Sequence, residues 1–321
     1  MRIAKDYSEI KNLSVGDVLA TPGFLCSQSA KDWGYFIEGN LVLPFYIKKK
    51  FIFEYMVFPT SVYGINYIEE ESAFLESLVR YLKKELQIDF ILSQHVTALF
   101  NTYPAHSIYC RFGSYILDLS QNEEVLLTKI HSKHRNVIKK AEKDGVVISC
   151  DSKNRSRCID LIQKTLKRQH VPLINQEVWD RFNKIKNVDY WLAEYNGKIE
   201  GSAIILWGEN NKAYYMYGGS SVKPHAGAMN LLHWEAIKKM KERNVLYYDF
   251  VGARINPKEG SKYEGIQRFK SRFGGDLQEG YLWKYILNKF KYRLFCFLLF
   301  ARSMGKYTGD IIDQERKRNS F

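Results

Sequence analysis

The sequence predicts an α/β fold of the α+β kind, in which two similar domains follow one another. Both halves show the same order of predicted elements, namely a hairpin, a further strand, an amphipathic helix and a short apolar strand. The chain has 321 residues, of which 45% are hydrophobic, and can therefore bury two ordinary cores. A basic segment with helical periodicity lies between the halves. The repeated order indicates duplicated domains rather than one large sheet.

The first half begins its regular structure with a hairpin. Residues 35–44, YFIEGNLVLP, place two apolar, β-prone runs around a Glu-Gly-Asn turn. Residues 72–86 then show apolar side chains at helical spacing, and the apolar strand 90–92 follows. We assign residues 1–127 to an N-terminal domain.

The segment that joins the halves is strongly basic. Residues 128–143, TKIHSKHRNVIKKAEK, predict one helix with a cationic face and a narrow apolar stripe, ending near Gly145. Such a helix is either a solvated connection or a landing surface for a polyanion such as RNA. We assign residues 128–145 to this connecting helix.

The second half repeats the order of the first. Residues 190–194 and 199–207 flank an Asn-Gly turn and predict another hairpin. An aromatic strand over 212–218 follows, then an amphipathic helix from about 228 to 243 and a strand over 245–250. We assign residues 146–284 to a C-terminal, catalytic domain.

Residues 285–321 form a basic tail that mixes aromatic and cationic side chains. Its longest apolar run, 294–301, is about eight residues long, far below the ~20 that a spanning helix needs. A basic amphipathic helix of this kind either packs back onto the protein or lies on an anionic membrane surface. The polar end is helical or frayed. The N-terminus has no apolar signal segment, so we expect a cytoplasmic protein, with or without peripheral contact at the inner face of the membrane.

Charge and cysteine usage narrow the class of protein. A net charge of +13 favours anionic partners such as tRNA, coenzyme A phosphates or anionic lipids, although it also serves solubility. The five cysteines form no C-x-x-C pair, and their odd number resists a complete set of disulfides, which fits a reducing compartment; we expect a reaction that needs no metal. We assign them no role.

Several motifs, in this order along the chain, resemble the FemABX family of peptidyltransferases and its GNAT acyltransferase relatives. They are residues 132–146, the hairpin at Asn196-Gly197, the stretch 217–220 (YGGS), the stretch 248–250 (YDF), and the stretch 269–275 (FKSRFGG). The resemblance implies two tandem GNAT-like domains, each a mixed, mainly antiparallel sheet flanked by helices. It also implies transfer of an acyl or aminoacyl group to an amine of a cell-envelope precursor, either a peptidoglycan peptide or an amino sugar.

The resemblance leaves the donor open. FemABX enzymes use aminoacyl-tRNA, whereas similar proteins are thought to use acyl-coenzyme A; either would be a co-substrate rather than a permanently bound cofactor. The sequence lacks the heptads of the helical arm in longer members. Loop 221–227, SVKPHAG, stands where a GNAT domain cradles pyrophosphate, and Lys223 echoes that motif without matching its spacing. The expected acceptor is a UDP- or lipid-linked envelope precursor.

Aminolysis of an ester or thioester passes through an oxyanion, which a fixed cation can stabilise. Among the many lysines, the family-like Phe269-Lys270 pair singles out Lys270 for this role and Phe269 as its neighbour in the pocket. Asp249, at the end of a strand, either relays the amine proton or orders the following loop. These three are the catalytic candidates.

The substrate-binding candidates are less specific. A planar guanidinium suits pyrophosphate, so the family-like Arg168 is a phosphate ligand candidate, and small residues after an aromatic strand allow close approach of a ligand. The complete set is Tyr217, Arg168, Lys31, Gly218, Gly219 and Lys223. The alternative function is a non-catalytic RNA- or polyanion-binding module on the same doubled fold.

Overall fold

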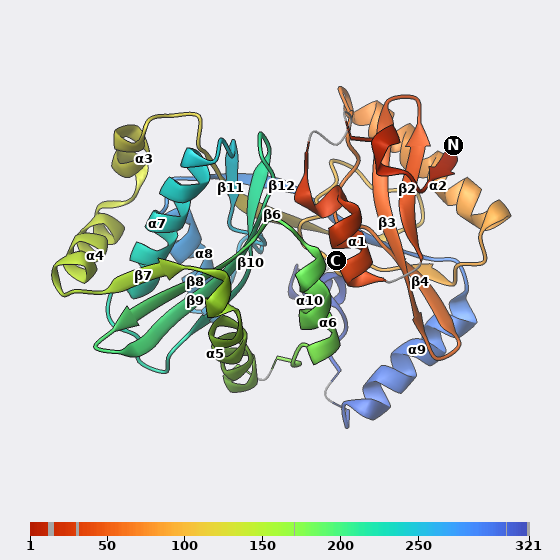
Figure 1. Cartoon of the computed structure of the whole chain (residues 1–321). Coiled ribbons are helices and arrows are strands. Elements are labelled where there is room, and N and C mark those ends of the chain that lie inside the picture. Colours follow the sequence, from red (N-terminus) through yellow and green to blue (C-terminus); the bar gives the residue numbers. More distant parts are fainter. Residues whose placement is uncertain (12–15, 30–31, 170, 306, 320–321) are drawn as a thin grey trace.

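The computed structural model describes residues 1–11, 16–29, 32–169, 171–305 and 307–319, and these form one α/β molecule (Figure 1). Across the described residues, strands join in the order β1-β2-β3-β4-β5-β12-β6-β11-β10-β9-β8-β7. Most neighbours are antiparallel, while β4–β5 and β10–β11 are parallel. The mixed, mainly antiparallel sheet flanked by helices is confirmed.

The N-terminal half contains the predicted hairpin and helix. Its strands are β1 (Arg2–Ala4), β2 (Trp33–Glu38), β3 (Leu41–Lys50), β4 (Phe53–Val57) and β5 (Phe90–Ile91). Its helices are α1 (Pro22–Gln28) and α2 (Ile68–Glu85), with short 3-10 turns η1 (Tyr7–Glu9) and η2 (Val18–Ala20). Helix α2 starts earlier than its apolar pattern because the Glu70 carboxylate accepts from the backbone amides of Asn66 and Tyr67 and so caps the first turn.

The C-terminal half repeats this arrangement. Its strands are β7 (Val147–Cys150), β8 (Val188–Tyr195), β9 (Lys198–Trp207), β10 (Lys212–Ser220) and β11 (Tyr247–Asp249). Its helices are α5 (Arg155–Arg168), α6 (Gln176–Arg181), α7 (Ala228–Glu242) and α8 (Lys262–Ser271), with 3-10 turns η3 (Ser152–Asn154) and η4 (Phe182–Lys184). Helix α7 connects the parallel pair β10–β11, as α2 connects β4 and β5.

Two long strands join the halves, so the expectation of two separate sheets was wrong. Strand β12 (Asp276–Ile286) pairs with β6 (Ile108–Asp118) along nine positions, and its last two residues also pair with β5. Strand β6 pairs with β11 on its other side. Pairing between strands so distant in sequence leaves no mark on local periodicity, which explains why the sequence did not predict the junction.

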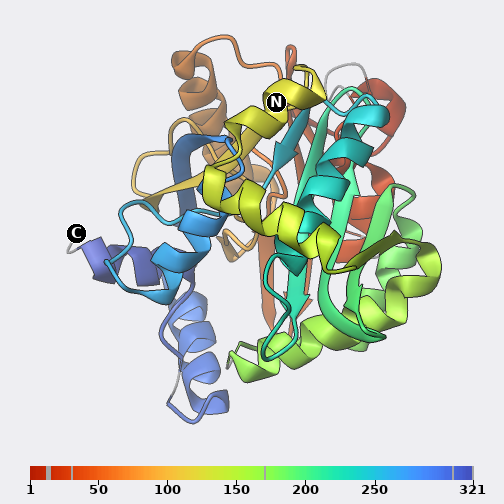
Figure 2. The ribbon, with the colours of Figure 1, turned by 90° about the vertical axis from the view of Figure 1, so that its left-hand side faces the viewer.

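The basic connection is two helices rather than one. Helix α3 (Glu123–Lys129) ends at Ile130, and α4 (Ser132–Lys143) begins after His131, whose Nδ1 accepts from the Lys133 amide. The Arg135 guanidinium donates to the carbonyls of Thr128 and Ile130 and so satisfies the end of α3. Helix α4 then packs across α7 (Figure 2).

The tail folds back onto the molecule as two helices. Helix α9 (Lys289–Arg302) lies against the N-terminal half, and α10 (Ile311–Asn319) packs on β6 and β12 (Figure 1). In the part of the chain that the structure describes, no helix has both the length and the apolar character to cross a bilayer.

The close contact of α4 with α7 supplies a test of the fold. Gly227, at φ 91°, caps α7, and a Cβ built there would lie 2.2 Å from the Val137 carbonyl oxygen. Gly145 has a similar φ of 86° but nothing within 4 Å. Both Gly→Ala variants strain the backbone, but only Gly227→Ala must also push the helices apart. In urea denaturation, Gly227→Ala should therefore lose about 2 kcal/mol more stability than Gly145→Ala. Equal losses would contradict this packing.

Candidate active site

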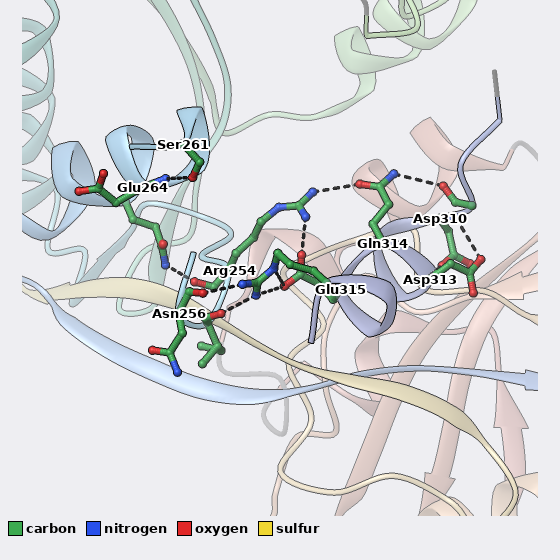
Figure 3. Close-up of polar contacts among 12 residues, drawn as sticks. Arg254, Asn256, Ser261, Glu264, Asp310, Asp313, Gln314 and Glu315 are labelled. Carbon is green, nitrogen blue, oxygen red and sulfur yellow. Dashed lines mark hydrogen bonds and ion pairs between the residues drawn. The ribbon is translucent and has the colours of Figure 1, made fainter. Parts of the chain in front are cut away.

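A cavity of about 680 Å³ lies in the C-terminal half, between β10, the end of β11 and helix α8. Its walls include Gly218, Gly219, Val251, Phe269 and Lys270. Helix α8 is capped at its start: the Ser261 hydroxyl accepts from the Glu264 amide (Figure 3), and the Glu264 carboxylate accepts from the amide of Gly260, the residue before the cap. The sequence therefore brings the predicted Phe-Lys pair to a cavity wall.

Lys270 is a buried cation held by backbone carbonyls. Its side chain is 8% exposed, and its Nζ donates to Val251 O at 2.5 Å and Gly252 O at 2.7 Å. Val251 and Gly252 both have positive φ, 49° and 78°, which turns the chain sharply at this point. Burial lowers the pKa of Lys270 to about 8, against the opposing influence of Asp249. An ammonium has three donors, so one N–H remains after these two bonds.

Asp249 lies behind this lysine rather than in the cavity wall. Its carboxylate accepts from the Ser114 hydroxyl and, at 2.7 Å, from the Val251 amide. Burial raises the pKa of Asp249, whereas these two hydrogen bonds lower it. The geometry shows Asp249 ordering the loop after β11; its role as a proton relay stays a prediction.

The C-terminal helix α10 clamps the same loop (Figure 3). The Arg254 guanidinium pairs with the fully buried Glu315 and donates to the Gln314 side chain at 3.0 Å. Arg318 donates to the carbonyls of Ile255 and Asn256. The end of the chain that the sequence left as helical or frayed is therefore helical and packed, and it supports the loop that binds Lys270.

Phe269 packs its ring inside an aromatic cluster beside the cavity. Its centroid lies 5.3 Å from those of His134 and Phe273, and 5.7 Å from that of His233. His233 is fully buried, and its Nδ1 lies 2.9 Å from the Tyr248 hydroxyl. Burial, followed by the Lys270 charge, lowers the pKa of His233 to about 3, so this ring is neutral. No local sequence pattern singles out His233, which lies on the buried face of α7.

A β-bulge in β10 determines which of its side chains line each of two cavities. The register with β9 shifts between Tyr215 and Tyr217, leaving Met216 without a partner. Tyr215 and Met216 line the Lys270 cavity, whereas Tyr217 lines a second cavity on the other side of the strand. Tyr217 is thus separated from Lys270, although the two were predicted to serve one site.

Gly218 and Gly219 line the Lys270 cavity, but internal packing explains why they are glycines. A Cβ at Gly218 would overlap the Tyr215 hydroxyl at 1.7 Å, and one at Gly219 would lie 2.9 Å from the backbone of α5. Close approach of a ligand to these two glycines stays a prediction.

The second cavity, the basic cavity, measures about 640 Å³ and lies between the halves. Lys48, Lys50 and Arg181 line it together with Tyr46 and His95. Burial, and then the charges of Arg181 and Lys50, lower the pKa of Lys48 to about 8. A bound anion would favour the charged form of Lys48. Asp32 and Glu177 also line the cavity, and Glu177 pairs with Arg181.

The remaining predicted residues have different surroundings. Arg168 donates to Ser220 O at 2.9 Å, at the edge of the Lys270 cavity. Lys223 is exposed on loop 221–227 and does not line that cavity, although Pro224 does. Lys31 lies outside the described residues. Phosphate binding by these three stays a prediction.

Comparison with known proteins gives one family match. Residues 164–298 match the FemAB family. Over 105 residues, the chain is 32% identical to lipid II:glycine glycyltransferase of Staphylococcus haemolyticus (strain JCSC1435), a match that covers 32% of this chain and 25% of the relative. The match thus spans about a quarter of that relative's length.

Solved structures share the fold. The crystal structure of FemX superposes with a TM-score of 0.68 at 16% identity, covering 92% of this chain and 99% of that one. A conserved protein of unknown function from Bacteroides thetaiotaomicron VPI-5482 superposes with a TM-score of 0.58 at 14% identity, covering 88% and 96%. At these identities the likeness concerns the fold. The resemblance to FemABX proteins that the motifs predicted is confirmed.

The buried lysine makes a prediction about stability. Its pKa of about 8, against 10.5 for an ordinary lysine, corresponds to roughly 3 kcal/mol. Below pH 8 the lysine is charged in both the folded and the unfolded protein, and burying that charge lowers the free energy of unfolding by the full ~3 kcal/mol. Between pH 8 and 10.5 only the unfolded chain keeps the proton, so wild-type stability rises relative to Lys270→Met by up to ~3 kcal/mol.

Urea denaturation at a series of pH values measures this difference. The Lys270→Met variant loses the two hydrogen bonds to the carbonyls, and this lowers its free energy of unfolding by an amount that does not depend on pH. The change of the stability difference with pH therefore reports the titration of Lys270 alone. Arg268→Met, on the exposed face of the same helix, is the control and should show no such slope. A pH-independent difference between wild type and Lys270→Met would mean that Lys270 has an ordinary pKa.

Proposed function

Because residues 164–298 match the FemAB family, we propose that this chain transfers an aminoacyl group to an amine of a peptidoglycan precursor. The matched region includes β10, β11 and α8, which form the walls of the Lys270 cavity. The observation that carries the proposal is the buried Lys270 ammonium, which has two fixed backbone partners and one remaining donor.

The proposed reaction is aminolysis of an ester. The acceptor amine attacks the carbonyl carbon, a C–N bond forms, and the C–O bond to the leaving hydroxyl breaks. Negative charge develops on the carbonyl oxygen, where the remaining N–H of Lys270 stabilises it. The amine proton passes to the leaving oxygen, and Asp249 supports the Lys270 charge from behind.

We infer that the donor is an aminoacyl-tRNA rather than acyl-coenzyme A. Loop 221–227 already holds a carboxylate where a pyrophosphate would lie: Glu200 accepts from the Ser221 hydroxyl at 2.9 Å and the His225 amide at 3.0 Å. The N-terminus of α7 at Gly227 also packs against Val137. An anion and a neighbouring helix at this position oppose phosphate binding.

The basic cavity is proposed to bind the pyrophosphate of the acceptor. Lys48 and Lys50 supply cations there, and the Arg181 guanidinium, which pairs with Glu177, can bind phosphate oxygens by exchanging that partner. Tyr217 lines this cavity and Met216, its neighbour on β10, lines the other. An acceptor anchored by its pyrophosphate could thus direct its amine past β10 to Lys270.

Exposed lysines on α4 support a second candidate, a non-catalytic RNA-binding module. Lys133, Lys139, Lys140 and Lys143 are exposed on this helix, whereas Arg135 is engaged at the end of α3. The same lysines would also bind the tRNA of an aminoacyl-tRNA donor. Binding of RNA therefore does not distinguish the aminoacyltransferase from the RNA-binding module, and turnover must be measured.

Removal of the Lys270 charge is the decisive kinetic test. Lys270→Met should lower kcat by about 10²-fold or more, because an oxyanion donor acts only in the transition state. Arg268→Met removes a nearby charge on the exposed face of α8 and should leave kcat unchanged. Lys133→Gln/Lys139→Gln should raise KM for tRNA without lowering kcat. Full turnover by Lys270→Met would remove this lysine from the reaction.

The donor is tested by transfer itself. With an amine-bearing peptidoglycan precursor as acceptor, the protein should form product from aminoacyl-tRNA and none from acyl-coenzyme A. Glu200→Gln, which removes the charge in loop 221–227, should improve whatever weak binding coenzyme A has, seen as a shift in melting temperature. Transfer from acyl-coenzyme A alone would overturn the proposed donor.

A further inference from the structure

One exposed surface combines apolar and basic side chains from two distant segments. Helix α9 and the turn between β3 and β4 lie side by side (Figure 1). Phe295 on α9 is buried against the ring of Phe53 at 5.3 Å and that of Phe90 at 5.1 Å. One face of α9 is thus fixed in the core, so its opposite face has a defined direction.

The outward face of α9 carries large apolar side chains at helical spacing. Phe290 is 76% exposed, Phe297 63%, Phe300 50% and Met304, just beyond the helix, 89%. Arg293 lies on the same face, between Phe290 and Phe297. The surface of a soluble protein rarely exposes so many large apolar side chains side by side. Such a cluster indicates an interaction site.

The adjoining turn adds two more exposed apolar residues at a backbone cost. Phe51 is 78% exposed and Ile52 62%, and Phe51 has φ 57°. Other hairpins of this chain place Gly39, or Asn196 and Gly197, at such angles, as expected for tight turns. A phenylalanine with this backbone angle is strained, and its side chain is not buried within the chain. A binding partner that buries the side chain would offset the strain.

The charges around this apolar surface are positive and unneutralised. Within the described residues, Lys289, Arg293 and Arg302 have no carboxylate within 4.0 Å. Nearby acidic side chains already pair with other cations, Asp89 with Lys291 and Glu54 with Lys49. An anionic partner with an apolar layer beneath its charges complements both features.

We propose that the membrane-docking patch, formed by Phe51, Ile52, Phe290, Phe297, Phe300 and Met304 with Lys289, Arg293 and Arg302, inserts into the interface of an anionic lipid bilayer. The aromatic side chains enter the boundary between head groups and acyl chains, and the cations bind lipid phosphates. The protein lies on the bilayer without spanning it.

The patch continues directly into the basic cavity. Lys48, Lys49 and Lys50 line that cavity at the end of β3, and Phe51 follows them as the first residue of the turn. At about 3.3 Å per residue, Lys48 lies roughly 10 Å from Phe51, which is the depth scale of the head-group region. Resting on the proposed function, this places the pyrophosphate of a lipid-linked acceptor in the cavity while its hydrocarbon chain stays in the bilayer.

Vesicle flotation tests the patch separately from catalysis. The full chain should float with vesicles of equal parts phosphatidylcholine and phosphatidylglycerol, and salt should weaken this binding. Phe51→Asn and Phe297→Ser should each lower the partition coefficient about tenfold, since each removes one buried aromatic side chain. The double variant Arg293→Gln/Arg302→Gln should lower binding to these anionic vesicles and leave binding to vesicles of phosphatidylcholine alone unchanged.

Two controls exclude indirect effects. Asparagine tolerates positive φ, so Phe51→Asn should melt at the same temperature as the wild type or higher. Val147→Thr removes a side chain that is 62% exposed at the opposite edge of the sheet and should leave flotation unchanged. Wild-type protein that ignores anionic vesicles, or a self-associated protein that Phe51→Asn dissociates without any vesicle binding, would overturn the proposal.

Acceptor choice distinguishes this inference from the proposed function. Phe51→Asn should lower turnover of an acceptor on a long hydrocarbon chain in vesicles and leave turnover of a water-soluble, nucleotide-linked acceptor unchanged. Equal turnover of the vesicle-bound acceptor by wild type and Phe51→Asn would contradict the role of the patch. Absence of transfer to either acceptor by wild type would overturn the proposed function, while the flotation result would stand.

Discussion

The pairing of β6 with β12 is the constraint on which the rest of the molecule depends. Both β11 and β12 run antiparallel to β6, one on each side, so they are parallel to one another. The chain between them must cross over β6, and α8 is that crossover. Lys270 therefore stands above the end of β11, beside the carbonyls that bind it. The other edge of β12 reaches β5 and fixes the N-terminal half, with its basic cavity, against the same scaffold.

A buried lysine in this position needs support from several segments. The carbonyls of Val251 and Gly252 take two of its donors, Asp249 fixes the start of the loop, and α10 holds the loop further on through Arg254 and Glu315. Desolvation lowers the pKa of the lysine toward neutrality, but its charge persists at pH 7. A cation that is partly desolvated and held by fixed dipoles stabilises a developing oxyanion more strongly than a solvated one.

Local patterns predicted what local forces determine. The hairpins at Gly39 and at Asn196-Gly197 and the helices α2 and α7 follow from turn chemistry and apolar spacing, and the structure contains them. The β6–β12 junction, the bulge at Met216 and the clamp from Glu315 to Arg254 arise from contacts between distant segments, for which periodicity holds no information.

The same limit applies to the candidate site. Lys270, Phe269, Gly218 and Gly219 were found through a resemblance and do line one cavity, yet the glycines serve packing. Tyr217 faces the other cavity because a single bulge shifts the alternation of β10. The neutral His233 could not have been singled out, since its burial depends on the packing of α7.

The position of the reacting carbonyl can be measured in a crystal structure with an aminoacyl-adenosine analogue, in which an amide replaces the reactive ester. We expect the aminoacyl carbonyl oxygen to lie within hydrogen-bond distance of Lys270 Nζ, with the two bonds to Val251 and Gly252 retained. An analogue bound with its carbonyl away from Lys270, or bound in the basic cavity instead, would contradict this expectation.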